Sequence, residues 1–237
     1  MPSSTSIASA DDKSKELYKT RRLLIYDYWV LGIVSTWAWG CPTAAYPLPQ
    51  FRANIGKNHL DIGIGTGYYL RKGKIPSTTK ITLMDIEKTA LDFALKRCGR
   101  PDARGMVADI LKPLPTQEKY DSISMYYLLH CIPASIEEKC SIFSHIKDNM
   151  TPDGVIHGAN VVAKGVRKDN KFAAHMRRKV LEAGIFQNLE DKPYDFEHAL
   201  RQNFHEVEVR VVGTVFVFRA AKPKLSTKAV VLPVSEK

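Results

Sequence analysis

Short apolar segments alternate with amphipathic ones between residues 58 and 162 of the chain. Apolar runs bounded by turn residues favour strands, whereas apolar residues that recur every three or four positions favour helices. Residues 87–97 show the helical spacing, and Ser135 and Glu138 form a capping box that predicts the start of another helix. The predicted strands are 58–62, 80–84, 105–108, 121–126 and 155–162. Strands that alternate with helices favour an open parallel sheet with helices on both faces.

The C-terminal part of the chain shows a different pattern. Residues 169–183 form an amphipathic, basic segment that predicts a surface helix, and Asp195 is a suitable N-cap for a helix at 196–204. Two alternating segments, 206–212 and 214–220, are separated by one glycine and predict a tight hairpin. Such a hairpin adds an antiparallel edge to a parallel sheet. The sequence therefore predicts an α/β fold with a mixed, mostly parallel sheet of seven strands.

The length of 237 residues fits one globular domain. Residues 1–15 are polar and rich in serine, which predicts a disordered arm. Residues 16–50 have a helical pattern rich in aromatic residues, interrupted near its end by prolines, and predict an N-terminal helical lid. Residues 51–222 are expected to form the ligand-binding domain, and residues 223–237 a flexible tail.

The composition is that of a globular protein, with 44% hydrophobic and 25% charged residues. The net charge of +10 would attract acidic partners, but the charges are scattered, which favours a solvated basic surface. The four cysteines show neither a Cys-x-x-Cys pair nor a zinc spacing, so reduced or buried thiols are expected. The sequence shows no signal peptide and no run of 18 apolar residues. A cytoplasmic protein without a membrane partner is therefore expected.

A glycine loop follows the first predicted strand. Asp61 precedes Gly63, Gly65 and Gly67 in the form acidic-x-Gly-x-Gly-x-Gly. Glycines allow the backbone to turn sharply and to approach a ligand without a Cβ clash. The loop leads into a helix start, where free N–H groups favour a carboxylate or a phosphate. Asp85 ends the next strand, where an acidic side chain can accept hydrogen bonds from both hydroxyls of a ribose.

The spacing of this loop separates two cofactor classes. A dinucleotide-binding loop has the form Gly-x-Gly-x-x-Gly, but here the third glycine comes one residue early. Asp61 would repel a pyrophosphate, whereas it can bind a cationic amino acid group. Asp109 ends the third strand beside the same crevice, where sheets of this kind bind ligands. The loop therefore favours S-adenosylmethionine over NAD.

These segments together resemble the motifs of the class I S-adenosylmethionine-dependent methyltransferases. Residues 61–67 resemble their first motif, Asp85 stands where their ribose-binding acid stands, and 108–110 resembles their adenine-contacting segment. Residues 120–130 resemble their fourth motif, and 151–155 the turn into their fifth strand, with Asp153-Gly154 in place of two glycines. The resemblance implies a Rossmann-like fold, S-adenosyl-L-methionine as cofactor and S-adenosyl-L-homocysteine as product. The sequence shows neither clustered carboxylates nor an Asp-Asn pair near the fourth strand, so no metal is expected. The cofactor-binding residues that it implies are Asp61, Gly63, Gly65, Gly67, Asp85, Ile86, Asp109, Ile110 and Tyr126.

Residues 26–32, 39–43 and 127–133 more particularly resemble a bacterial and fungal subgroup of small methyltransferases, some of them in secondary metabolism. This resemblance implies methyl transfer to an O, S or N atom of a small molecule. It does not identify the acceptor.

Four residues are predicted to bind the acceptor. Tyr26 and Trp37 are expected to cover an apolar pocket, with simple packing of the N-terminal helix as the alternative. Tyr127 and His130 follow the fourth strand, and His130 is the predicted general base, with a purely structural histidine as the alternative. Weaker candidates are His157, His175 and, as a nucleophile, Cys131, for which a buried thiol is the alternative.

Two other functions stay open. A nucleic-acid methyltransferase would suit the basic charge, but residues 124–127 read Ser-Met-Tyr-Tyr, without the Pro-Pro pair typical of enzymes that methylate base amines. The sequence also shows no nucleic-acid-binding module, so nucleic acid is not the expected partner. A non-catalytic cofactor-binding protein would keep the same loop. The sequence leaves the oligomeric state open.

Overall fold

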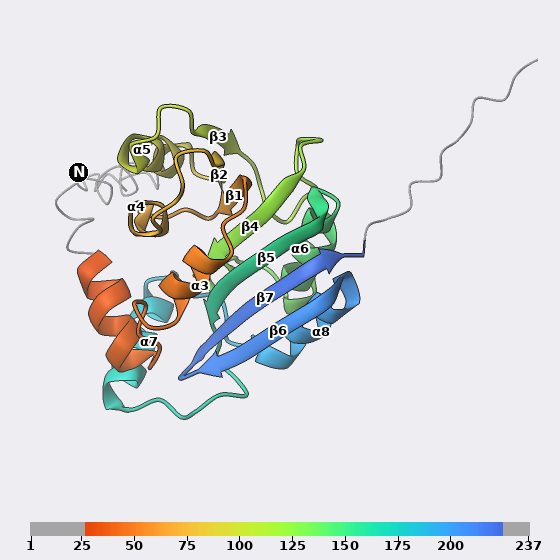
Figure 1. Ribbon diagram of the computed structural model, residues 1–237. Helices are drawn as coiled ribbons and strands as arrows, with labels where there is room; N and C mark the ends of the chain where they lie inside the picture. Colours follow the sequence, from red (N-terminus) through yellow and green to blue (C-terminus); the bar gives the residue numbers. More distant parts are fainter. Residues whose placement is uncertain (1–26, 225–237) are drawn as a thin grey trace, which may run out of the picture.

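The computed structural model describes residues 27–224, and within them a single seven-stranded sheet organises the fold (Figure 1). Strands β1 to β5 run parallel, and β7 lies antiparallel between β5 and β6 in the order β3-β2-β1-β4-β5-β7-β6. The strands are β1 (Asn58–Ile62), β2 (Lys80–Asp85), β3 (Arg104–Val107), β4 (Tyr120–Tyr126), β5 (Met150–Val161), β6 (Phe204–Val212) and β7 (Val215–Pro223). The predicted mixed, mostly parallel sheet with its C-terminal hairpin is confirmed.

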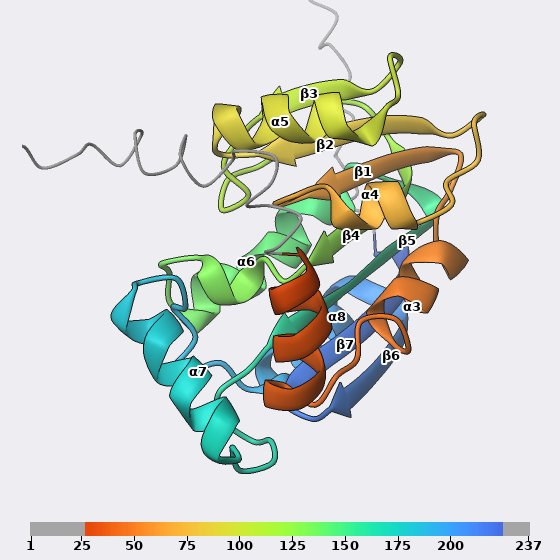
Figure 2. The same ribbon diagram turned by 90° about the vertical axis from the view of Figure 1, so that its left-hand side faces the viewer.

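Helices cover both faces of this sheet. They are η1 (Asp27–Ala38), α3 (Pro47–Ala53), α4 (Tyr68–Lys72), α5 (Lys88–Cys98), η2 (Leu129–Cys131), α6 (Ile136–Lys147), α7 (Lys171–Glu182) and α8 (Pro193–Asn203). Successive strand residues point to opposite faces, so Met125 packs with the buried residues of α6 and α8, whereas Tyr126 packs with η1 and α3. The N-terminal helix η1 lies beside α7, which Figure 2 shows from the side. These two helices stand over the carboxyl ends of the central strands.

Helix η1 is tied to the glycine loop by a buried carboxylate. The hydroxyl of Thr66 donates a hydrogen bond to Oδ1 of Asp27, and Nη2 of Arg97 donates to Oδ2 at 2.6 Å. The other Arg97 nitrogen, Nη1, donates to the carbonyl of Thr66 at 2.7 Å. Only about 5% of the Asp27 side chain is exposed, so the pair is shielded from water. The contacts fix the first turn of η1 beside the loop.

Three local expectations need correction. The Asp153-Gly154 pair is no turn before the strand, because β5 already begins at Met150 and carries these residues in a bulge between its pairings with Tyr120 and Ser122. Asp195 is not an N-cap, because Pro193 begins α8 and places Asp195 in its first turn, after Lys192. Proline suits a first helical position, where no N–H partner is needed. The same preference explains the short helix α3, which begins at Pro47. The sequence pattern predicted only that this proline interrupts the helical pattern of residues 16–50.

The other boundaries agree with the predictions to within one to three residues, and the capping box at Ser135 and Glu138 is present. Some predictions lie outside the described residues. These are the disordered arm at 1–15, the part of the lid at 16–26 and nearly all of the tail.

Candidate functional site

A cavity of about 250 Å³ opens between the glycine loop, the end of β4, helix η1 and the α7 region. Its wall is largely apolar and aromatic, with a few polar groups. Such walls are typical of small-molecule sites. The lining residues are Trp29, Val30, Leu31, Val34, Ser35, Trp39, Asp61, Gly63, Ile64, Gly65, Thr66, Tyr68, Tyr69, Tyr126, Tyr127, His130, Cys131, Val161, Met176, Val180, Ile185 and Phe186. The cavity therefore joins segments that lie far apart in the sequence.

The glycine loop forms one end of this cavity. The amide of Gly63 donates to the carbonyl of Met84 at 2.9 Å, which holds the loop against β2. Gly63 and Gly65 both have positive φ, a region that side chains with a Cβ rarely adopt. A Cβ on Gly63 would meet the side chain of Leu128 at 2.6 Å, whereas nothing lies within 4 Å of one on Gly65. Gly67, at φ 69°, precedes α4. The free space at Gly65 leaves the backbone open to a ligand.

Asp61 presents a buried carboxyl group to the cavity. Its Oδ1 accepts a hydrogen bond from the hydroxyl of Ser124, and His59 lies behind that hydroxyl, with Nε2 at 3.1 Å. Burial raises the pKa of Asp61 to about 7, the Ser124 hydrogen bond lowers it, and the nearby Asp85 adds to the rise. A cationic ligand group would favour the ionised form. Asp61 is therefore suited to bind an ammonium.

Asp85 ends β2 and Asp109 lies just beyond β3, and neither of these residues lines the cavity. Oδ1 of Asp85 accepts from the amide of Glu87 at 3.0 Å, which orients the carboxylate. Oδ1 of Asp109 likewise accepts from the amide of Leu111 at 3.0 Å. Ile86 exposes 64% of its surface, whereas Ile110 is buried in the main core. This edge offers an acidic group and an exposed apolar surface outside the cavity itself.

Tyr126 lines the cavity from the end of β4. Its ring stacks on that of Tyr69 with centroids 4.3 Å apart, and its hydroxyl lies 2.9 Å from Nδ1 of His157. His157 is fully buried and lies outside the lining, and burial lowers its pKa well below the ordinary value. His157 therefore supports Tyr126 from behind, without reaching the cavity.

His130 is buried at the cavity wall, on the short helix η2. Its Nδ1 lies 2.7 Å from Oδ1 of Asn160, and its ring packs against Phe186 with centroids 4.3 Å apart. Burial lowers the pKa of His130 to about 4, the Asn160 contact raises it, and the cations Lys139 and Arg177 lower it further. The imidazole is therefore neutral near pH 7 and can accept a proton in the cavity.

The remaining predicted residues fall in different places. Tyr127 lines the cavity, and its hydroxyl lies 3.2 Å from that of Ser35. Its backbone adopts the left-handed conformation, with φ at 59°. Trp37 does not line the cavity, and 68% of its surface is exposed; Trp29 and Trp39 line the cavity instead. His175 lies on α7, away from the cavity lining. Tyr26 lies outside the described residues.

The structure gives little support for a role of the cysteines or of a metal ion. Cys131, the last residue of η2, lines the cavity and is exposed, so the expectation of a buried thiol is wrong for this residue. All four cysteines are free. Within residues 27–224 no group of three or more His, Cys, Asp or Glu is arranged to hold a metal ion. In the same range, no helix has the length and apolar character needed to cross a bilayer.

The sequence did not indicate two sets of site residues. Asp27 and Arg97 hold the loop through Thr66. Arg97 belongs to no motif, and Asp27 lies in the segment 26–32, whose resemblance to a subgroup indicates no role for it. Met176, Val180 and Phe186 close the cavity from the α7 region. The amphipathic pattern of α7 predicted a buried face, and that face is the signal that could have placed these residues at a site.

Comparison with known proteins identifies the family. Residues 60–154 match the model of a methyltransferase domain. The chain is 67% identical to the N-methyltransferase vrtF of Penicillium aethiopicum, over 88% of each chain. It is 56% identical to the O-methyltransferase adaD of Aspergillus niger, over 91% of this chain and 90% of that one. The chain belongs to the class I S-adenosylmethionine-dependent methyltransferases.

The solved structure of a DhpI–SAH complex shares the fold of this methyltransferase. It superposes with a TM-score of 0.56 at 18% identity, over 89% of this chain and 96% of that one. The predictions of a Rossmann-like fold and of a methyltransferase are confirmed. The predicted transfer to a small molecule agrees with the relatives.

Proposed function

We propose that this methyltransferase transfers the methyl group of S-adenosylmethionine to an oxygen or nitrogen atom of a largely apolar, aromatic small molecule. The observation that carries the proposal is the single cavity that joins Asp61 and the glycine loop to an aromatic wall containing His130. One end is suited to a cationic, polar donor and the other to an apolar acceptor. The relatives are named for N- and O-methyl transfer, which supports either atom here. Sulfur remains a third acceptor atom for testing.

The residues present fit the donor. Asp61 would accept hydrogen bonds from its ammonium group, and Gly65 leaves room for its approach. Asp85 would accept from the ribose hydroxyls, since its carboxylate is already oriented by the Glu87 amide. The exposed Ile86 would cover one face of the adenine, beside Asp109. When bound, S-adenosylmethionine supplies an activated methyl group on a sulfonium.

The acceptor side supplies alignment, exclusion of water and a proton acceptor. An apolar wall would exclude water from the reacting atoms, and it is formed by Trp29, Trp39 and Phe186. Positioning of two reactants can supply roughly 7–11 kcal/mol of a barrier. His130 is neutral near pH 7 and would take the proton of an O–H or N–H acceptor. A thiol acceptor needs such a base less, because its ordinary pKa is about 8.5.

Calorimetric titration with S-adenosylmethionine and, separately, with NAD tests the donor. Binding of S-adenosylmethionine but not of NAD is expected. Methyl transfer is then measured from isotope-labelled donor to a panel of phenols, arylamines and thiols, with and without EDTA. Transfer to a phenol or arylamine, unchanged by EDTA, would support the proposal. Binding of NAD in place of S-adenosylmethionine would contradict it.

A further inference from the structure

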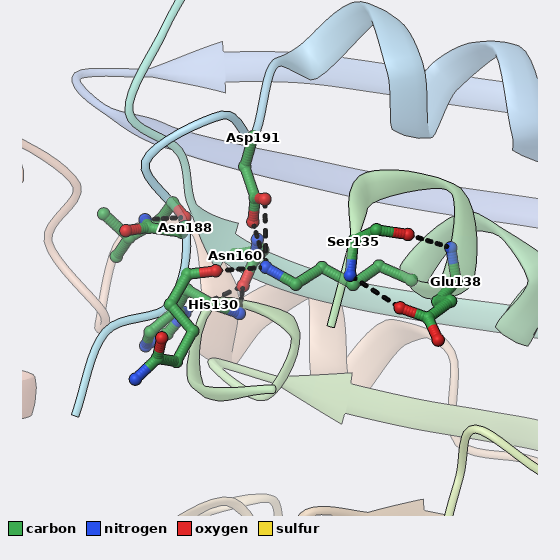
Figure 3. A network of polar contacts seen from close by, with 9 residues as sticks. His130, Ser135, Glu138, Asn160, Asn188 and Asp191 are labelled. Carbon is green, nitrogen blue, oxygen red and sulfur yellow. Dashed lines mark hydrogen bonds and ion pairs between the residues drawn. The ribbon is translucent and has the colours of Figure 1, made fainter. Parts of the chain in front are cut away.

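Asn160 meets His130 at two atoms in the buried wall behind the cavity. Asn160 lies near the end of β5, and its Oδ1 is 2.8 Å from the backbone nitrogen of His130 and 2.7 Å from its Nδ1. Both residues are buried. Figure 3 shows them in one polar cluster with Asp191, which pairs with Lys139. The two contacts share a single Asn160 atom.

That shared atom determines which ring nitrogen of His130 carries the proton. A backbone N–H can only donate, so the Asn160 atom that faces it must be the amide oxygen. The same oxygen has no hydrogen, so the Nδ1 at 2.7 Å must be a protonated donor. In the neutral ring the proton is then on Nδ1, and Nε2 keeps its lone pair. The assignment follows from donor and acceptor chemistry alone.

We propose that Asn160 is a positioning residue, which holds His130 in the Nδ1–H form so that Nε2 takes the proton of the methyl acceptor. The proposal rests on the proposed function of methyl transfer. As the acceptor atom forms its bond to the methyl carbon, its O–H or N–H electrons remain on that atom and its proton passes to Nε2. The broken carbon–sulfur bond leaves its electron pair on sulfur. The imidazolium then returns the proton to solvent.

The other end of the Asn160 amide supports a functional reason for this residue. Its Nδ2 is buried and has no hydrogen-bond partner among the described residues. An unsatisfied buried donor costs stability, whereas an apolar residue of similar size would avoid that cost. An asparagine at this position therefore needs a compensating role. The two hydrogen bonds through Oδ1 provide it.

The charges around His130 set how the ring titrates. Lys139 approaches from α6 and is paired with Asp191, and Arg177 approaches from α7 and is paired with Asp169. Both cations oppose protonation of the imidazole, and burial opposes it more strongly. The neighbouring groups on its own segment are Tyr127 and Cys131. The carboxylates of Asp191 and Asp169 are already paired with these cations. A carboxylate at position 160 would therefore add one unpaired negative charge near His130.

The variant Asn160→Asp keeps both acceptor contacts and changes only the charge. Its carboxylate is expected to raise the pKa of His130 by about one to three units from about 4. Nitrogen-15 NMR of the imidazole follows this titration without any substrate, with His130→Gln providing the assignment. The rate–pH profile, measured with an acceptor from the panel, should lose activity at low pH over the same range. An unshifted His130 titration would overturn the proposal.

Asn160→Leu removes the acceptor, and Asn188→Leu is its matched control. Asn188 is also buried, and its Nδ2 donates to the carbonyl of Val161 at 2.9 Å, so its loss tests packing without removing a hydrogen bond to His130. In Asn160→Leu, NMR should show a mixture of ring tautomers, and kcat per folded molecule should fall by less than the roughly 10²–10⁴-fold that loss of a general base costs. The Nδ1–H form persisting in Asn160→Leu, or an equal fall in both variants, would overturn the proposal. Absence of methyl transfer in the unsubstituted enzyme, with the Nδ1–H form present, would contradict the proposed function and leave the tautomer assignment standing.

Discussion

The proposed donor end and the proposed acceptor end of the cavity are built in different ways. The donor end comes from one continuous loop, in which backbone conformation at Gly63 and Gly65 and the carboxyl of Asp61 do most of the work. The acceptor end is assembled from side chains of η1, η2 and the α7 region, which are distant in sequence. A local backbone requirement restricts the sequence strongly, whereas an apolar wall can be built from many combinations of residues. The relatives are named for different acceptor atoms, nitrogen and oxygen, which agrees with an acceptor end that can vary.

The sharpest separation of the two ends is expected from His130→Gln. Loss of a general base lowers turnover by about 10²–10⁴-fold. Donor affinity should stay unchanged, because Asp61, Asp85 and the glycine loop remain intact. Turnover is measured with labelled donor, and affinity by calorimetry. Full activity in this variant would remove His130 from the chemistry, and weakened donor binding would show that the two ends are not separate.

Asp85→Ala is the complementary change at the donor end. Hydrogen bonds to a charged group contribute about 1.5–3 kcal/mol, so the dissociation constant of the donor should rise by about tenfold to 150-fold. Asp92→Ala is the control, because Asp92 lies on α5 in an exposed pair with Lys88. The same calorimetric titration serves both variants. Equal effects in the two would mean that general charge, not ribose binding, attracts the donor.

Donor binding should also depend on pH through Asp61. Burial raises the pKa of this carboxyl to about 7, so its ionised share falls from about one half at pH 7 to about one eleventh at pH 6. Donor affinity should therefore fall about fivefold over that interval, because only the carboxylate attracts the ammonium strongly. In Asp61→Asn, affinity should be lower and independent of pH over this range. A pH dependence that survives the substitution would assign the titration to another group.

The smallest expected effects are changes in stability, and they differ between alanine substitutions at Gly63 and at Gly65. A non-glycine residue in the left-handed region costs about 1–2 kcal/mol, which lowers the melting temperature by about 2–8 °C in a domain of this size. Gly65→Ala should show only this cost, because nothing lies near its Cβ, but should weaken donor binding. Gly63→Ala should be less stable still, since its Cβ meets Leu128 at 2.6 Å. Thermal unfolding with and without donor ranks the two variants, and identical behaviour would contradict the ranking.

Most of the fold, and the likeness to a family, could be predicted from local patterns. Alternating strands and helices gave the sheet, and the loop from Asp61 to Gly67 gave the cofactor class. The bulge at Asp153-Gly154 and the start of α8 were missed because strand pairing and a first-turn proline override simple turn and cap preferences. The aromatic ring of Trp37 suits a residue that covers a pocket, but which face of η1 turns inward depends on packing against α7. Asn160 carries no motif, because its partner is reached only through the folded sheet.

The buried carboxylate of Asp27 joins the first turn of η1 to the glycine loop through Thr66 and Arg97. Since η1 also lines the proposed acceptor end, both substrates would rest on a shared support. A substrate that orders this support lowers the entropy cost left for the second, which is a coupling free energy between two sites. Thermodynamic reciprocity then requires that the donor changes the affinity for the acceptor by the same factor by which the acceptor changes the affinity for the donor. The order in which the two arrive can change the rate of assembly of the ternary complex, but not its stability.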